Sequence, residues 1–415
     1  MKELQKNDRN RVFWWAVILC TLYLSYRYPL QINASGTSST YSDTPVALQL
    51  GKFILACPLF AIAAVRCLRK PLTLRRWLAC LGILFLAGYS LLKVVGDSDL
   101  KYIELAFWML FPLVLVWGGN AIRRTAIERY LQFLLVCALG STVIQVFIFI
   151  VFGRLPALAY EGTFLIRFGG FLDDPNGFGA ILFLLMGWSY GRFKGSARFL
   201  IVGGIVVCLM LTQSWTALAF FLVVCVVWLL RMAWKRPWLV ALLICGCLVL
   251  GMILVRNMPQ SPATVFEAMM NAKQGSIEGH SFSWQSWFLR WPQWIMLGDA
   301  KYNPYESWWA GALVNFGVVW LVVFIGLMAK LLMVLRQELL RADSETRPIY
   351  LGFLLFGYYF VFGSLSLPFP TIFPVNFLFF LFCVLAVFGQ IKPAGGDRVR
   401  SMAELSQLRS SAAVR

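Results

Sequence analysis

The apolar residues of this chain fall in blocks of about twenty, separated by short clusters rich in lysine and arginine. An uncharged run of that length is what the roughly 30 Å hydrocarbon core of a bilayer requires of an α-helix. Blocks such as residues 53–65 and 377–388 do not alternate between apolar and polar positions, as the strands of a membrane β-barrel would. The pattern predicts an all-α polytopic membrane protein with about twelve transmembrane helices. The predicted spans lie near residues 12–28, 46–65, 77–95, 104–122, 130–152, 177–191, 199–213, 215–232, 237–255, 309–329, 348–367 and 371–390.

The composition agrees with this pattern. The chain has 415 residues, of which 60% are hydrophobic and 13% charged, and its mean hydropathy is +0.73. Ordinary soluble domains are roughly 45–50% apolar and about 25% charged. The composition therefore excludes a soluble enzyme. The first span has a basic N-terminal flank and no small-residue cleavage site behind it, so we expect no cleavable signal.

The net charge of +18 would suggest a nucleic-acid partner in a soluble chain, but its distribution indicates topology instead. With a cytoplasmic N-terminus, 27 of the 37 lysines and arginines fall in cytoplasmic segments. By the positive-inside rule, both termini of this multi-pass chain are expected in the cytoplasm, and no nucleic-acid partner is expected. The basic clusters lie at residues 2–11, 66–76, 123–129, 192–198, 231–236, 330–347 and 392–415.

The domain organisation follows from the spans. Residues 1–390 are expected to form a single integral membrane domain, and residues 391–415 a basic cytoplasmic tail. Two non-cytoplasmic loops, about 153–176 and about 256–308, are long enough to carry structure of their own. The polar side chains of interest gather in these loops, while the span interiors are almost free of charge, which argues against an ion-coupled transporter. The loop charges are Arg154, Glu161, Arg167, Asp173 and Asp174, then His280, Arg290, Asp299, Lys301 and Glu306.

The second loop also carries a belt of aromatic residues. Trp284, Trp287, Trp291 and Trp294 lie within residues 281–296. Such a belt is typical of the lipid–water interface, where an amphipathic ring is half wetted. The belt either anchors the loop alone or also holds a ligand at the membrane surface.

Arginine among aromatic residues at a membrane surface suits an anionic lipid headgroup, because the guanidinium fork binds phosphate oxygens bidentately. Arg167 is the stronger candidate, since the glycine-rich segment after it opens a span; Arg154 is either a phosphate contact or a boundary residue. Asp174-Pro175-Asn176 is expected to make a turn that caps the following helix. Asp174 is then either a solvated cap or a participant in the chemistry.

Two blocks of sequence begin a recognisable pattern. The first is Arg167-x-x-Gly170 followed by Asp174-Pro175-Asn176 at the start of a span. The second is residues 211–218, Leu-Thr-Gln-Ser-Trp-Thr-Ala-Leu, at the turn between two spans.

The third block runs from His280-x-x-x-Trp284 through Gly298 to Glu306 and Gly317. Together the blocks, over about residues 160–330, resemble the bacterial O-antigen ligase and polymerase superfamily of membrane glycosyltransferases. The resemblance implies a multi-pass protein of the bacterial inner membrane, with a helix bundle like that of the class C glycosyltransferases and a large periplasmic loop before the tenth span. It also implies chemistry without a metal or other cofactor; no metal-ligand spacing appears among the cysteines.

The chain departs from the family pattern at three positions. Trp215 stands where the family usually has arginine, His280 where it has its second arginine, and Glu306 where it has histidine. Arg290, in the same loop as His280, is our candidate for the missing guanidinium.

The chemistry implied is transfer of a sugar from a lipid diphosphate to a hydroxyl. Its leaving group is a diphosphate, so cations near the bridging oxygen should contribute most. We assign Arg167 and Arg290 to a diphosphate clamp and Glu306 to the general base, the alternative for Glu306 being an anion favoured by a helix dipole. His280 is either a phosphate contact or an exposed residue without function. The remaining residues expected to bind substrate are Arg154, Asp174, Asn176, Trp284 and Lys301.

Because the family histidine is absent at position 306, the pattern favours a polymerase of undecaprenyl-diphosphate-linked repeat units, which would make O-antigen, capsule or exopolysaccharide. The alternatives are an O-antigen ligase, which transfers glycan to lipid A-core, and a flippase or other transporter of lipid-linked glycan. The partners of such a polymerase would be the lipid-linked glycan and its acceptor, with a chain-length regulator and a flippase.

Overall fold

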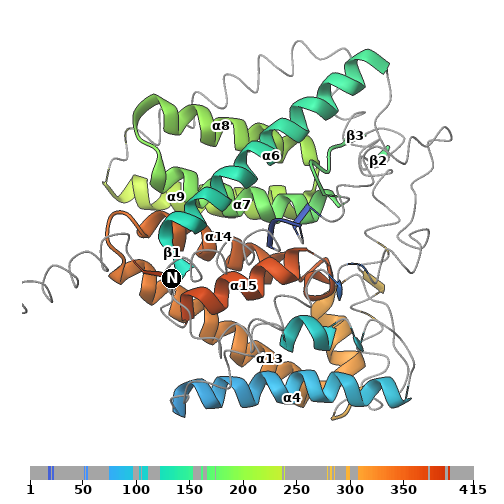
Figure 1. Cartoon of the computed structure of the whole chain (residues 1–415). Helices are drawn as coiled ribbons and strands as arrows, with labels where there is room; N and C mark the ends of the chain where they lie inside the picture. Colours follow the sequence, from blue (N-terminus) through green and yellow to red (C-terminus); the bar gives the residue numbers. More distant parts are fainter. Residues whose placement is uncertain are drawn as a thin grey trace, which may run out of the picture.

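The structure of the protein is a computed structural model (Figure 1). It describes residues 17–19, 21–22, 51, 53–54, 74–96, 102–103, 105–110, 122–152, 160–161, 166–172, 174–235, 238, 278, 281–282, 285, 296–299, 307–372, 374–387 and 391–392. Helices account for most of them. The helices are α4 (Leu74–Gly96), α6 (Arg124–Phe152), α7 (Pro175–Arg192), α8 (Gly195–Thr212), α9 (Trp215–Lys235), α13 (Trp308–Arg341), α14 (Arg347–Gly363), the 3-10 turn η3 (Phe369–Thr371) and α15 (Val375–Val387).

Among the described residues, four helical segments are long and apolar enough to cross a membrane: Arg124–Val151, Gly195–Thr212, Trp215–Met232 and Trp308–Arg341. They coincide with four predicted spans, so the prediction of a mostly helical chain with membrane-spanning segments is confirmed at this level. Helices α4, α7, α14 and α15 lie at four more predicted spans, and their crossing of a membrane stays a prediction. The predicted spans 12–28, 46–65, 104–122 and 237–255 fall largely outside the described residues.

Four short strands were not part of the all-helical prediction. Each has two residues: β1 (Ile122–Arg123), β2 (Tyr160–Glu161), β3 (Ile166–Arg167) and β4 (Ile391–Lys392). β1 pairs with β4 in parallel, and β2 pairs with β3 in antiparallel orientation. The β1–β4 pair joins the start of α6 to the chain after α15, whereas β2 and β3 pair within the loop before α7.

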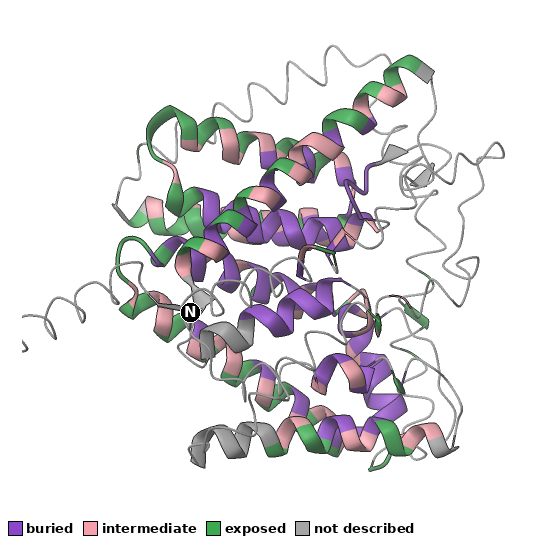
Figure 2. Ribbon diagram, in the orientation of Figure 1, coloured by how far each residue is buried: buried purple, intermediate pink, exposed green. Residues whose placement is uncertain are grey.

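Helix α7 is the centre of the bundle, and it packs most closely against α14. A Cβ atom built on Gly187 would lie 2.8 Å from the Leu351 carbonyl oxygen, and one on Gly352 would lie 2.8 Å from the Leu184 carbonyl oxygen. Only glycine permits this approach of two backbones, which is how helices gain contact area in an apolar solvent. Figure 2 shows α7 buried along nearly its whole length, whereas α6, α8 and α9 each expose one face.

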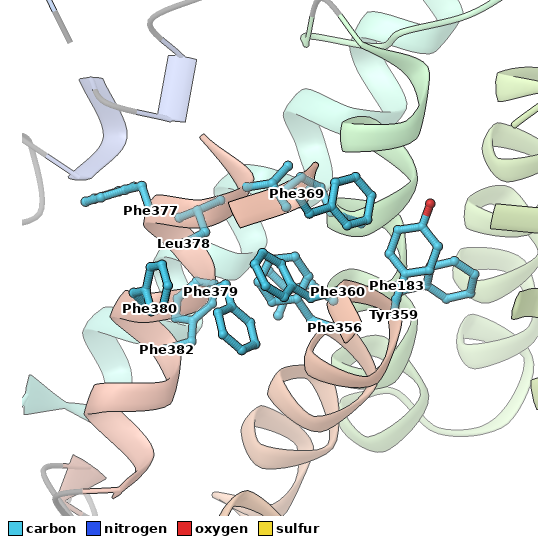
Figure 3. Close-up of a cluster of buried hydrophobic side chains, with 14 of the residues drawn as sticks. Phe183, Phe356, Tyr359, Phe360, Phe369, Phe377, Leu378, Phe379, Phe380 and Phe382 are labelled. Atoms are coloured by element: carbon cyan, nitrogen blue, oxygen red, sulfur yellow. The ribbon is translucent and has the colours of Figure 1, made fainter. Parts of the chain in front are cut away.

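An aromatic cluster joins α14, η3 and α15 (Figure 3). The rings of Phe360 in α14 and Phe379 in α15 are stacked with centroids 3.9 Å apart. Phe369 of η3 also stacks on Phe360, with centroids 5.9 Å apart. Tyr359 extends the cluster to Phe183 of α7 at 4.7 Å. Buried aromatic area of this size is the main apolar contribution to such a core. It holds the turn at residues 364–371 in a fixed place relative to α7.

Contacts between distant segments define two ends of the bundle. At the end that carries β1, Arg124 forms ion pairs with Glu128, at 3.1 Å, and with Glu345. We call this the β1 end, and the opposite end, which carries β2 and β3, the β3 end; Figure 1 shows them at the left and right of the bundle. In the described part of the chain, the segments predicted as cytoplasmic lie at the β1 end, and the predicted periplasmic loops lie at the β3 end.

Candidate functional site

The first turn of α7 is capped by Asp174, as the sequence predicted. The Asp174 carboxylate accepts hydrogen bonds from the backbone nitrogens of Asn176, at 3.1 Å, and Gly177, at 2.9 Å. Pro175 occupies the first helical position, where its missing N–H is not needed. The same carboxylate accepts from the Asn176 side-chain amide at 3.0 Å, so the cap also orients Asn176.

Asn176 joins the first sequence block to the second. Its Oδ1 accepts a hydrogen bond from the Ser214 hydroxyl at 2.5 Å, and its backbone oxygen accepts one from the Tyr359 hydroxyl at 3.4 Å. Ser214 in turn accepts from the backbone nitrogen of Ala217, at 3.2 Å, and so caps α9. The N-termini of α7 and α9 therefore meet through one hydroxyl group.

The residue before Ser214 has an unusual backbone. Gln213 adopts the left-handed conformation with φ 46° and is the one non-glycine residue with positive φ in the described part of the chain. Its side-chain oxygen is buried, and no hydrogen-bond partner lies near it within the described residues. Strained backbone and unpaired buried acceptors both concentrate at functional sites.

The turn after α14 links α9 to α13. The hydroxyls of Thr216 and Ser366 lie 2.6 Å apart and share a hydrogen bond. The backbone oxygen of Ser364 accepts from the backbone nitrogen of Trp308 at 3.0 Å, at the first residue of α13. We call Asp174, Asn176, Ser214, Thr216 and Ser366 the polar junction, because they join the N-termini of α7 and α9 to the turn after α14.

The third sequence block contributes a break in α13. Gly317 has φ 82° and ψ 175°, which interrupts the helix between residues 316 and 318. The segment 296–299 fills the break: the backbone nitrogen of Asp299 donates to the Val314 oxygen at 2.6 Å. Gly298 lies so close to Asn315 that a Cβ atom would overlap the Asn315 backbone. The two glycines of this block are therefore packing partners.

Helix α4 fixes the same segment from the other side. The Tyr89 hydroxyl donates to the backbone oxygen of Leu297 at 2.6 Å, and the Lys93 ammonium donates to the backbone oxygen of Asp299 at 2.8 Å. The end of the second loop is thus held by α4 and α13 together.

The structure describes three of the nine predicted site residues. Asp174 and Asn176 lie together in the polar junction. The backbone of Arg167 lies in β3, where it pairs with Tyr160. The other predicted site residues lie outside the described residues: Arg154, His280, Trp284, Arg290, Lys301 and Glu306. Trp215, one of the three positions at which the chain differs from the sequence pattern it resembles, begins α9 and exposes 43% of its surface.

Several residues of this end were missed by sequence reasoning. Thr216 and Ser366 look like ordinary helix-end hydroxyls, and nothing in the sequence joins them across 150 residues. Gln145 is the more informative omission, because it is a lone amide in an otherwise apolar stretch of α6. A polar side chain in a span is costly unless it has a partner, and that rule could have found it.

Chemically, the polar junction offers hydroxyl and amide groups and one carboxylate, all engaged with helix ends. Within the described residues, no three His, Cys, Asp or Glu side chains gather as a metal site would require. No protein-family model matches the chain, and no curated protein is significantly similar to it.

Proposed function

We propose that this chain is a glycosyltransferase that polymerises undecaprenyl-diphosphate-linked repeat units at the periplasmic face of the inner membrane. The single observation that carries the proposal is the convergence of the described parts of the three sequence blocks at the β3 end. The Ser214–Asn176 hydrogen bond joins the first block to the second, and the Thr216–Ser366 and Ser364–Trp308 contacts extend the connection to α13. Blocks separated by up to about 130 residues thus share one end of a helical bundle, as parts of one site must.

The electrostatics of this end favour a diphosphate. Helices α7, α9 and α13 all begin here, so three helix N-termini, each with the partial positive charge of its dipole, lie at this end. Arg167 lies in β3, at the same end. We assign Arg167 and Arg290 to the diphosphate oxygens, where a fixed positive charge stabilises the leaving group as its bond to the sugar breaks. The arrangement would also bind the intact donor.

The remaining task is removal of the proton from the acceptor hydroxyl, which we assign to Glu306. Helix α13 begins at Trp308 with Ser307 as its N-cap residue. Glu306 therefore directly precedes the cap, a position from which an acidic residue can act as a base or as an anion favoured by the helix dipole. A carboxylate next to buried Ser307 and Trp308 would be partly desolvated, which raises its basicity.

The experiment that tests the proposal is glycan analysis of a strain that lacks this protein. Loss of a polymerase leaves single repeat units on lipid A. Loss of a ligase leaves long chains on the lipid carrier, and that result would move the assignment to transfer onto lipid A-core. Normal glycan length and amount in the deletion strain would contradict both enzymatic assignments.

A further inference from the structure

Gln145 is a fully buried amide in the second half of α6, with 0% of its surface exposed. The helix around it is strongly apolar, and its window from Arg124 to Val151 has the hydropathy of a membrane span. An amide buried in such surroundings without hydrogen bonds destabilises the fold. The partners of Gln145 therefore indicate why an amide is present.

Both hydrogen bonds of this amide go to one residue. The Gly170 nitrogen donates to Gln145 Oε1 at 3.0 Å, and Gln145 Nε2 donates to the Gly170 oxygen at 3.2 Å. Gly170 has φ +60°, and a Cβ atom there would overlap the ring of Phe178. The amide holds Gly170 from one side while the Phe178 ring of α7 closes the other.

This contact adds a side-chain anchor from α6 to a segment whose backbone is also held at other points. The Phe168 nitrogen donates to the Leu211 oxygen at 3.1 Å, and the Leu172 nitrogen donates to the Gly169 oxygen at 3.1 Å. In the sequence, Gly170 lies between Arg167 and Asp174, which caps α7. The side chain of Gln145 thus connects α6 to the middle of the first sequence block.

We propose that Gln145 is a positioning residue, whose amide sets the backbone at Gly170 and thereby the backbone position of Arg167, three residues earlier, for contact with a polyprenyl diphosphate. The inference rests on the proposed function, because it needs Arg167 to contact the diphosphate. Leucine or methionine would fill the same volume between α6 and the segment 168–172. Only a side chain with both a donor and an acceptor can bind the nitrogen and oxygen of Gly170 at once.

Three variants of the full-length protein separate positioning from simple stabilisation. Gln145→Leu removes both hydrogen bonds and keeps the volume. Gln145→Glu keeps the shape, and its carboxyl group reproduces the donor and acceptor only while it is protonated. Gln132→Leu is the matched control, because Gln132 lies on the same helix and is exposed. Binding of radiolabelled undecaprenyl diphosphate is measured in detergent from pH 5 to 9, with undecaprenol as the comparator, below the melting temperature of each variant.

We expect Gln145→Leu to weaken diphosphate binding on the order of tenfold at every pH, while Gln132→Leu binds as the unmodified protein does. For Gln145→Glu we expect near-normal binding at low pH. Burial raises the pKa of a carboxyl group, and binding should weaken as the pH rises through that raised value, because the carboxylate then repels the Gly170 oxygen. Each affinity is divided by that of the unmodified protein at the same pH, which removes the titration of the diphosphate itself.

The outcomes distinguish the two proposals. If the unmodified protein binds undecaprenol as tightly as undecaprenyl diphosphate, the proposed function is wrong. If it prefers the diphosphate, and Gln145→Glu follows its affinity at every pH, the positioning role of Gln145 is wrong. The melting temperature of Gln145→Glu could fall as the pH rises while its relative affinity stays constant. That result would likewise assign Gln145 to stability alone. Should Gln145→Leu not fold, the pH profile of Gln145→Glu still decides the question.

Discussion

Ser214 and Asn176 lie 38 positions apart in the sequence, yet the Ser214 hydroxyl donates to Asn176 Oδ1 at 2.5 Å. The same hydroxyl accepts from the Ala217 nitrogen, so it uses both its donor and an acceptor position. Ser214 is fully buried. One hydroxyl therefore couples the caps of α7 and α9, and the geometry of the first turn of each helix depends on the other.

Replacing Ser214 by alanine should lower the free energy of unfolding by about 1–3 kcal/mol, because it removes a buried hydrogen bond and leaves the Ala217 nitrogen without its acceptor. Thermal melting in detergent measures the change. A double-mutant cycle with Asn176→Ala should give a coupling of about 0.5–3 kcal/mol. Ser196→Ala, at an exposed position near the start of α8, is the control and should melt normally. Additive effects of the two junction substitutions would contradict the coupling.

The parts of this site that the sequence predicted are the local ones. Asp174-Pro175-Asn176 predicted a cap because the acceptor, the fixed φ and the N–H groups lie within four residues. The Gln145–Gly170 contact was not predictable in this way, since its partners are 25 residues apart and a hydrophobic pattern records burial without pairing. The predicted span 371–390 begins late, at Val375, because Phe369–Thr371 forms a 3-10 turn. Gly317 appeared in the third block, but a glycine within an apolar run gives no sign that the helix breaks there.

The break in α13 makes a prediction about stability. Gly317→Ala places a side chain at φ 82°, where its Cβ atom would overlap the Met296 carbonyl group. Backbone strain of this kind costs about 1–3 kcal/mol, and displacement of segment 296–299 adds to it, so the melting temperature should fall clearly. Gly326→Ala is the control in the same helix, because nothing lies within 4 Å of the added atom. Equal melting of the two variants would show that the break does not hold the second loop.

The orientation of the bundle can be tested with reporters of sidedness. Fusions after Arg192 and Arg236 should read cytoplasmic, and an insertion near Gly275 should read periplasmic, because the distribution of cations leaves no comparable alternative. The ion pairs at the β1 end agree with a single side of the membrane for the segments that meet there. Arg192 Nε lies 3.8 Å from Glu128 Oε1, and Arg124 pairs with Glu345. A cytoplasmic signal near Gly275 would remove the proposed site from the periplasm.

Arg167 tests the diphosphate clamp. Arg167→Lys keeps the positive charge and loses the planar fork, so a bidentate phosphate contact predicts a large loss of activity with normal amounts of protein in the membrane. Polymer length and amount in cells, with immunoblotting of the membrane fraction, give the two measurements. Arg231→Lys is the control, because Arg231 lies near the opposite end of α9. If Arg167→Lys retains normal polymer, Arg167 has only a structural role and the proposed clamp is wrong.

The last prediction concerns Glu306, for which a base and a helix-end anion have different consequences. Glu306→Gln preserves size and most hydrogen-bonding capacity and removes charge and basicity. As an anion near the N-terminus of α13, its loss should cost roughly 0.3–1 kcal/mol of stability and little turnover. As the general base, its loss should lower the rate on the order of 10²–10⁴-fold while the lipid-linked donor still binds and accumulates.

Rates of glycan elongation in purified membranes, with thermal melting of the same variant, separate these two results. The control is Glu278→Gln, because Glu278 is exposed and belongs to the same loop. Glu306→His is the companion variant, since it restores the residue type of the family pattern, and a histidine near its ordinary pKa can also accept a proton at neutral pH. Partial recovery of turnover in Glu306→His relative to Glu306→Gln would support the base. Near-normal elongation by Glu306→Gln would place the base elsewhere, with His280 and Asp174 as the next residues to replace.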